Sequence, residues 1–240
     1  MTLLALPSQP DLIDQVHDRL VAAVVDGTLL PGQRLTQDEL ATMLGVSRQP
    51  VSHAIQVLRR RGLLVDAGTR GIAVAPIDGQ RIRDLYQVRA ALDGLAAELA
   101  ARKCQAHPIP AQPAIAAQRA LERGATLPAE VPMAVLIDAD VAFHAAIHEL
   151  SGNGAIAESV NEQWPHFRRS MQVALALPAM RARVWAEHNA ILAAILAGDA
   201  TTAGELARTH TERAGEETAR QLETAARGKT ASKSNGEETP

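Results

Sequence analysis

The hydrophobic pattern of this chain departs from helical spacing in one region, residues 63–75, just before Pro76. Before that proline, three stretches with helical spacing of apolar residues are followed by two short strand-like runs around the turn DAGTRG. The helical stretches cover residues 11–26, 36–45 and 47–61, and the strand-like runs cover residues 63–65 and 72–75. After Pro76 only helical spacing follows, and prolines or glycines separate the stretches at about 78–104, 111–123, 131–150, 154–177, 180–197 and 200–226. We therefore predict a mainly α protein with two domains: three helices plus a β-hairpin over residues 1–76, and an all-α helical bundle over residues 77–226.

The composition favours a helical protein and indicates its cellular compartment. Alanine and leucine dominate the apolar content, and aromatic residues are limited to two tryptophans, one tyrosine and two phenylalanines, which favours helices over sheets. The single cysteine, Cys104, excludes an intramolecular disulfide and is typical of a reducing compartment. The sequence has no signal-peptide layout and no apolar run near the roughly 18 residues of a membrane span. We expect a cytoplasmic protein with no membrane partner. Residues 227–240 are predicted to form a disordered tail.

The first domain has the order of elements of a winged helix-turn-helix. The four residues LGVS separate its second and third helical stretches, and the strand pair that follows would form the wing. Thr36 and Glu39 have the spacing of a capping box at the start of the second helix. In this motif the helix after the turn enters the major groove of DNA through its N-terminal residues. Residues 47–76 contain five arginines and one acidic residue, although the whole chain has a formal net charge of -3. The sequence therefore predicts a local DNA-binding surface.

The candidate DNA contacts lie at the start of the third helix and in the wing. Arg48 stands where a bidentate contact to a guanine edge is geometrically possible. The other candidates are polar or conformationally permissive residues of the same region, namely Arg34, Ser47, Gln49, Ser52, His53, Gly68, Thr69, Arg70 and Gly71. The alternative is a helix-turn-helix that makes only protein contacts and whose arginines are merely solvated.

The segment DADVAFHAAIHEL carries ionisable side chains within an apolar helical stretch. Asp140 and His144 are four residues apart and so lie on one face of a helix. His188 precedes Gly198 by ten residues, and His210 follows Ala200 by ten. If the two helices fold back antiparallel, these imidazoles end at the same level. One carboxylate and three imidazoles would suit zinc, nickel or manganese. The residues alone leave open a second interpretation, in which these are ordinary paired or solvated histidines.

Arg89 is unusual because it shares a helix face with Leu85, Leu92 and Ala96. A guanidinium on an apolar face indicates an anionic partner, such as the carboxylate of a ligand. Two simpler explanations remain: an i, i+4 ion pair with Asp93, or a side chain that extends to solvent.

The stretch LPGQRLTQDELATMLGVSRQPVSHAIQVLRRRGLL resembles the N-terminal domain of the GntR family of bacterial transcriptional regulators. The resemblance covers about residues 10–76 and rests on the pattern P-G-x-x-L, LA-x-x-LGVSR-x-PV and L-x-x-x-GL. It implies that Arg48 reads the operator and that the wing glycines enter a groove. Many members carry VREAL where this chain has VSHAI, so Ser52 and His53 replace an arginine, often a DNA contact, and a glutamate.

Residues 80–222 resemble the FCD ligand-binding domain, an all-helical bundle of six or seven helices that is attached to one branch of GntR regulators. Its pattern of D-x-x-x-H followed by two later histidines matches Asp140, His144, His188 and His210, which implies that these side chains hold a divalent metal ion. The domain length favours the shorter, six-helix, metal-containing variant. The resemblance also implies that Arg89 points into the effector pocket beside the metal, where it would clamp a carboxylate.

Together these features predict a homodimeric transcriptional repressor. It would bind an inverted-repeat operator in double-stranded DNA, and a small carboxylate effector would control that binding. Two other functions remain open from the sequence. The same site could belong to a metalloenzyme, because a metal held by an aspartate and three histidines with an open position can activate water. It could also serve a sensor of the metal ion itself.

Overall fold

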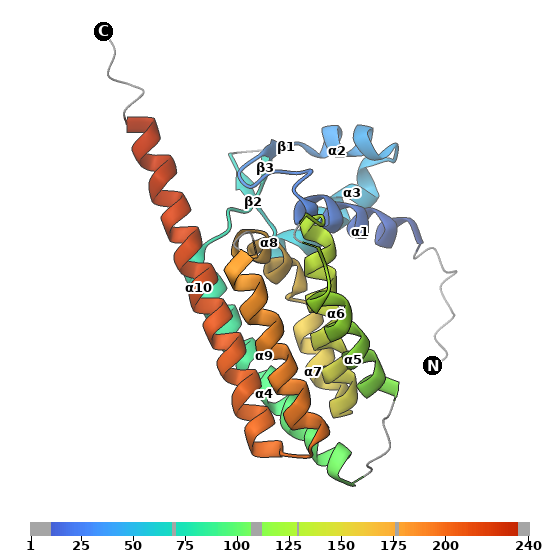
Figure 1. Ribbon diagram of the computed structural model, residues 1–240. Coiled ribbons are helices and arrows are strands. Elements are labelled where there is room, and N and C mark those ends of the chain that lie inside the picture. Colours follow the sequence, from blue (N-terminus) through green and yellow to red (C-terminus); the bar gives the residue numbers. More distant parts are fainter. Residues whose placement is uncertain (1–10, 69–70, 107–111, 129, 176–177, 235–240) are drawn as a thin grey trace, which may run out of the picture. The chain divides into compact units, whose positions relative to one another are not determined.

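The computed structural model describes residues 11–68, 71–106, 112–128, 130–175 and 178–234. The chain divides into two compact units, Met1–Pro76 and Ile77–Pro240 (Figure 1). The first unit combines helices with a small sheet, and the second is helical throughout its described residues. The predicted fold class, a winged helix-turn-helix followed by a helical bundle, is confirmed. No helix in the described ranges has the length and apolar character to span a membrane.

The first unit contains three helices and a three-stranded antiparallel sheet. Its elements in chain order are α1 (Asp11–Asp26), β1 (Arg34–Leu35), α2 (Gln37–Leu44), α3 (Arg48–Arg60), β2 (Leu64–Ala67) and β3 (Gly71–Val74). The strand order is β1-β3-β2, with Arg34 opposite Ala73 and Leu64 opposite Val74. The sequence prediction missed β1, because two residues are too few to show a period of two. The apolar faces of the three helices and the sheet enclose one core that includes Leu20, Leu40, Ile55 and Leu58.

Local sequence signals fix the ends of α2. The Thr36 side chain accepts a hydrogen bond from the backbone N–H of Glu39, and the Glu39 carboxylate accepts one from the backbone N–H of Thr36 at 2.7 Å. This is the predicted capping box, which satisfies two backbone donors at the helix start. Gly45 ends the helix at φ 66°, a left-handed conformation that favours glycine. Only a short connection separates Gly45 from α3, so the end of α2 also sets the position at which α3 begins.

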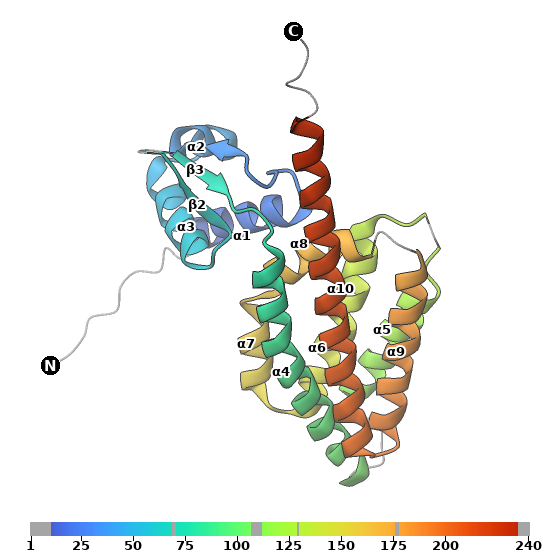
Figure 2. The same cartoon turned by 90° about the vertical axis from the view of Figure 1, so that its left-hand side faces the viewer.

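The described part of the second unit contains seven helices. They are α4 (Gly79–Ala106), α5 (Gln112–Ala125), α6 (Met133–Ser151), α7 (Gly154–Asn161), α8 (Trp164–Ala174), α9 (Pro178–Leu196) and α10 (Ala200–Ser234). Both views show α4 and α10 side by side (Figure 1, Figure 2). They run in opposite directions and approach closely where Gly94 faces Gly204: a Cβ on Gly94 would lie 3.2 Å from the Gly204 carbonyl oxygen. Glycine at these positions therefore permits the close packing of the two longest helices.

Two apolar clusters fill the bundle. One is built mainly from alanines of α4 and α5 with Phe143, Ile191 and Ile195, all fully or almost fully buried. The other surrounds Tyr86 and Phe167, whose rings meet edge to face with centroids 4.9 Å apart. The ionisable residues discussed below are buried among the same helices. Their desolvation must therefore be offset by partners within the bundle.

The helices of the second unit differ from the prediction in two places. The stretch predicted as one helix over residues 154–177 forms α7 and α8, so the described residues of the bundle contain seven helices rather than six. Pro165, in the first turn of α8, explains the interruption, because proline lacks the N–H needed inside a continuous helix. In addition, α10 continues to Ser234, eight residues into the segment predicted as a disordered tail. Extending a helix needs no new nucleus, and Arg227, Lys229 and Ala231 are good helix formers. Residues 235–240 lie outside the described residues.

Candidate metal centre and nucleic-acid interface

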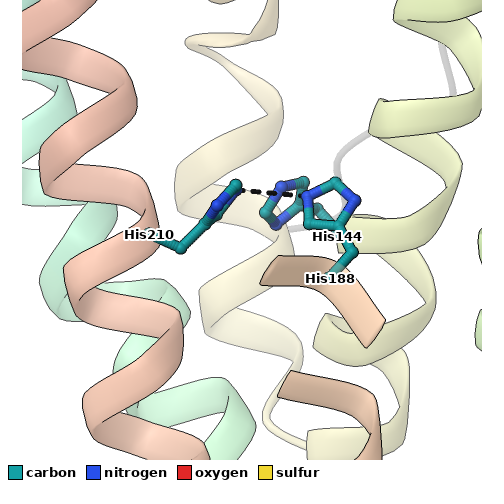
Figure 3. Close-up of side chains that lie close together, drawn as sticks. All are labelled: His144, His188 and His210. Carbon is teal, nitrogen blue, oxygen red and sulfur yellow. Dashed lines mark hydrogen bonds between the residues drawn. The ribbon is translucent and has the colours of Figure 1, made fainter. Parts of the chain in front are cut away.

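Three helices of the bundle bring four buried ligand-type side chains together. Asp140 and His144 come from α6, His188 from α9 and His210 from α10, with exposed fractions of 3%, 5%, 0% and 5%. Figure 3 shows the three imidazoles converging from their separate helices. The reversal of the chain at Gly198, where φ is +74°, lets α9 and α10 pair and places His188 level with His210. The structure thus brings together the four residues that the sequence pattern identified as metal-ligand candidates.

The distances within this cluster match one small coordination site. One ligand nitrogen from each of the three histidines lies within 4.8 Å of the others. The Nε2 atoms of His188 and His210 are 3.1 Å apart. Asp140 Oδ1 lies 3.6 Å from His188 Nε2, and Asp140 Oδ2 lies 3.9 Å from His144 Nε2. Donor atoms at such separations can share one ion whose bonds are about 2.0–2.2 Å long.

The protonation states and unsatisfied atoms fit a bound cation. Burial, aided by the positive charge of Arg89, lowers the pKa of His144 well below its usual value. Burial lowers the pKa of His188 well below its usual value in the same way. Both imidazoles are therefore neutral, the form that binds metals. Within the described part of the chain, the buried Oδ2 atom of Asp140 has no hydrogen-bond partner, and burial raises the pKa of this carboxyl group. A divalent ion of the zinc, nickel or manganese type would satisfy that oxygen and suits this donor set.

Glu187 orients His210, a role that the sequence analysis missed. Its Oε2 atom lies 2.7 Å from Nδ1 of His210, so the Nε2 atom of that imidazole faces the cluster. Arg213 donates to the other carboxylate oxygen at 2.5 Å, and Arg183 Nε lies 3.4 Å from it. Burial alone would raise the pKa of Glu187, but the hydrogen bond from His210 and the nearby arginines lower it overall. In the sequence, Glu187 stands out only because it precedes the ligand candidate His188 on α9. That position does not indicate a contact with a residue of α10.

Arg89 forms the ion pair that the sequence left open as an alternative. Its exposed fraction is 2%, and its Nε atom donates to Asp93 Oδ2 at 3.1 Å. Asp93 is also 2.7 Å from His148 Nε2, accepts a hydrogen bond from Thr211 at 2.9 Å, and lies 3.5 Å from His144 Nδ1. His148 is therefore buried beside the cluster. Burial alone would raise the pKa of Asp93, but Arg89 and these hydrogen bonds lower it overall, so the carboxylate is ionised.

Arg89 also lines a cavity together with three of the four metal-ligand candidates. The cavity, about 480 Å³ including its mouth, is lined by Arg89, Asp140, His144 and His210 among others. The guanidinium carbon lies 4.6 Å from the centre of the Trp164 ring, so this aromatic ring stabilises the buried cation. The bond to Asp93 uses Nε, which leaves the two terminal nitrogens of the fork as potential donors. The ion pair and an anion contact can thus coexist on one guanidinium.

The N-terminal end of α3 presents the predicted DNA contacts to solvent. Ser47, the N-cap, is exposed together with Arg48, Gln49 and His53, while Ser52 is half-buried. The Ser47 side chain makes no capping hydrogen bond to the helix. Its hydroxyl is therefore not used at the helix start, where DNA would meet the backbone of α3.

Arg48 is paired with Asp38 across the helix-turn-helix. Its Nη2 atom donates to Asp38 Oδ2 at 2.8 Å, and its Nε atom contacts the other carboxylate oxygen. The exposed fractions of these two side chains are 72% and 59%, so solvent screens the pair and DNA can compete with it.

The remaining DNA-contact candidates lie on the sheet. Arg34 is exposed on β1, opposite Ala73 of β3. Gly68 has a φ of +76°, and a Cβ on Gly71 would lie 2.6 Å from the Ala67 carbonyl oxygen, so the turn requires glycine at both positions. Thr69 and Arg70 lie outside the described residues.

Both parts of the chain match known protein families. Residues 84–229 match the model of the FCD domain, and residues 12–74 match that of the bacterial regulatory proteins of the gntR family. An uncharacterized HTH-type transcriptional regulator from an unstable DNA locus of Streptomyces ambofaciens is 28% identical over 203 residues, which span 81% of this chain and 80% of that protein. The uncharacterized HTH-type transcriptional regulator YdhC of Bacillus subtilis is 32% identical over 85 residues, which span 35% of this chain and only 38% of that protein.

Solved structures support the same fold. A putative transcriptional regulator GntR from Rhodococcus sp. RHA1 superposes with a TM-score of 0.69 at 25% sequence identity. The superposition covers 86% of this chain and 96% of that structure.

Proposed function

This chain belongs to the GntR family of bacterial regulatory proteins, in the branch that carries an FCD domain, and from that premise we propose that the FCD domain senses a small organic acid beside a bound metal ion. It is a DNA-binding transcriptional regulator and not an enzyme. The sequence left a metalloenzyme open as an alternative function. The family and the relatives are transcriptional regulators, which excludes this alternative.

One observation carries the proposal: Arg89 lines the same cavity as three of the four metal-ligand candidates, Asp140, His144 and His210. Asp140, His144, His188 and His210 would hold the ion, which would supply a positive charge for the carboxylate of the effector. Arg89 would contribute a second positive charge through its free fork. Zinc, nickel and manganese all suit one carboxylate and three neutral imidazoles.

The first unit would read an inverted-repeat operator as part of a homodimer. Two recognition helices about 34 Å apart are needed to contact successive major grooves, and one winged helix-turn-helix supplies only one of them. The exposed N-terminus of α3, with Arg48 as the main base-reading residue, supports this mode of binding. We propose that this regulator is a cytoplasmic repressor and that the effector releases it from DNA.

The test combines metal analysis, calorimetry and operator binding on the full-length protein. We expect close to one divalent metal per chain, binding of a small carboxylic acid that depends on the metal, and weaker operator affinity when the acid is present. Protein that purifies without metal and does not acquire it from solution would remove the metal site. Operator affinity that follows the free metal concentration, with no response to any acid, would identify a metal-ion sensor instead.

A further inference from the structure

Asp93 of α4 connects the anion side of the candidate site to its metal side. Its Oδ2 atom accepts a hydrogen bond from Arg89 Nε at 3.1 Å and one from the Thr211 hydroxyl at 2.9 Å. The same oxygen lies 3.5 Å from Nδ1 of His144, and the other nitrogen of that ring, Nε2, lies 3.9 Å from Asp140. One buried carboxylate oxygen thus contacts the guanidinium proposed to bind an acid and approaches a metal-ligand candidate.

The guanidinium of Arg89 is held in place by aromatic rings as well as by Asp93. Its carbon lies 4.6 Å from the centre of the Trp164 ring, 5.0 Å from that of Phe167 and 5.6 Å from that of Tyr86. The exposed fraction of the Arg89 side chain is 2%. The rings stabilise the cation through their electron-rich faces. The position of the fork therefore does not depend on Asp93 alone.

The positive charge that Arg89 offers an acid is offset inside the protein. Burial alone would raise the pKa of Asp93, but Arg89 and the hydrogen bonds to this carboxylate lower it overall, so Asp93 is ionised. An anion at the terminal nitrogens of Arg89 would feel the guanidinium and also the carboxylate bonded to its Nε atom. Repulsion by that carboxylate is strong because few solvent dipoles screen charges in the interior. In metal-free protein the fork therefore offers hydrogen bonds but little net attraction.

A cation at the ligand residues would change this balance. Asp140, His144 and His210 line the same cavity as Arg89. Burial, aided by Arg89, lowers the pKa of His144 well below its usual value, so this imidazole is neutral. A divalent ion bound by one carboxylate and neutral imidazoles leaves one positive charge unbalanced beside the fork. Only then does the cavity attract an anion through charge as well as through hydrogen bonds.

We propose that Asp93 makes acid binding conditional on the metal ion. In metal-free protein its carboxylate offsets the charge of Arg89. In metal-loaded protein the ligand residues carry the surplus charge, and Arg89 supplies the planar fork that orients the acid. This inference rests on the proposed acid-sensing function and specifies its regulation: the protein responds to the acid only when it carries metal. By thermodynamic linkage, the acid tightens metal binding by the same factor.

Acetate is the probe, because it is a carboxylate without a further polar group. The melting temperature of the full-length protein in sodium acetate is compared with that in sodium chloride at equal ionic strength, and the shift gives the affinity. Zinc-loaded protein is compared with protein freed of metal and of chelator. Metal-free wild type should bind acetate on the order of 100-fold more weakly, the effect of one unit charge at roughly 5 Å with an effective dielectric constant of about 20.

Asp93→Asn keeps the size of the side chain and removes its charge. Metal-free Asp93→Asn should bind acetate on the order of 30-fold more tightly than metal-free wild type, because Arg89 loses the anion at its Nε atom. Zinc affinity, measured by competition with a chromophoric chelator, should fall about 10-fold or more, since an amide is a weaker partner for Nδ1 of His144. Damage to the packing would lower both affinities, so the opposite signs identify the role of the charge.

Asp84→Asn is the matched control. It makes the same change at an exposed residue of the same helix, where the carboxylate accepts a hydrogen bond from Gln80. Neither acetate affinity nor zinc affinity should differ from wild type by more than about twofold, because solvent screens an exposed charge.

The outcomes separate this inference from the function on which it rests. Equal acetate affinity in metal-free and zinc-loaded wild type would overturn the inference and leave acid sensing intact, and this comparison decides even if Asp93→Asn does not fold. Acetate affinity that does not rise in metal-free Asp93→Asn, or that falls together with zinc affinity, would also overturn it. If zinc-loaded wild type does not respond to acetate, the inference and the acid-sensing function fail together.

Discussion

Glu187 Oε2 lies 2.7 Å from Nδ1 of His210, and the opposite ring nitrogen, Nε2, lies 3.1 Å from His188 Nε2. A carboxylate that accepts the Nδ1 hydrogen leaves Nε2 with a free lone pair. It also fixes the rotation of the ring about the side chain. The pair therefore presents His210 to the candidate metal centre in the tautomer that a metal requires.

Removal of this orienting carboxylate should weaken metal binding without removing a ligand. We predict that Glu187→Ala lowers the metal affinity about 10- to 100-fold, and that Glu187→Gln lowers it less because an amide oxygen can still accept from Nδ1. Competition titration with a chromophoric chelator measures both affinities. Glu98→Ala is the control, since Glu98 pairs with Arg102 instead of a site residue. Metal affinity unchanged in Glu187→Ala would show that the contact has no orienting role.

Loss of one imidazole ligand should remove the metal and its stabilising effect. For His188→Ala we expect little bound metal by elemental analysis. Its melting temperature should fall by on the order of 5–10 °C relative to wild type when free metal is near a hundred times its Kd. A chelator should lower the melting temperature of wild type to a similar degree and should not affect the variant. His53→Ala, which changes an exposed histidine of the first unit, should retain full metal content.

Substitution of Arg89 should separate its two roles. Arg89→Ala leaves Asp93 buried without its cation, so we expect a loss of stability on the order of 3–5 kcal/mol. Arg89→Lys keeps a positive charge near Asp93 and should retain metal, but an ammonium cannot grip a carboxylate with a planar fork. The affinity for a small carboxylic acid should therefore fall in Arg89→Lys while the melting temperature changes little. Calorimetry and thermal unfolding of the same samples measure the two effects, and an unaltered acid affinity in this variant would exclude the clamp.

Arg48 should carry operator recognition. Arg48→Ala is expected to weaken specific DNA binding by roughly 5- to 150-fold per half-site, the equivalent of a lost bidentate contact to guanine. Its melting temperature should not change, because the side chain is 72% exposed. Arg60→Ala, at the opposite end of α3, serves as the matched control. Gel-shift titrations at one salt concentration compare the variants, and wild-type affinity in Arg48→Ala would contradict the assignment.

The ion pair between Arg48 and Asp38 predicts a gain-of-affinity variant. Asp38→Asn removes a negative charge near the DNA surface and releases the Arg48 fork from its present partner. Operator affinity should rise by up to about fivefold, the upper range for an exposed pair, and the gain should shrink at high salt. The variant Asp38→Asn combined with Arg48→Ala should bind DNA no better than Arg48→Ala alone.

Local sequence signals were sufficient for most of the secondary structure. The capping box of Thr36 and Glu39 and the left-handed Gly45 set the limits of α2, since caps act within one helical turn. The i, i+4 spacing of Asp140 and His144 put both on one face of α6 without reference to any other element. The count of ten residues on either side of the break near Gly198 was enough to bring His188 level with His210. Such relationships depend only on the regular geometry of one helix or one tight reversal.

The contacts between helices distant in sequence were decided by tertiary packing. Glu187 reaches His210, and Asp93 gathers Arg89, His148 and Thr211, only because α4, α6, α9 and α10 pack with particular rotations about their axes. Successive side chains of a helix point 100° apart around its axis. A modest change in the rotation of a helix about its axis therefore turns a buried side chain toward solvent. The cavity has the same origin, since its lining combines side chains such as Arg89, His144 and His210 from different helices. The sequence by itself therefore determined which ligand-type residues could converge, whereas the packing of the helices decided what orients them and what lies beside them.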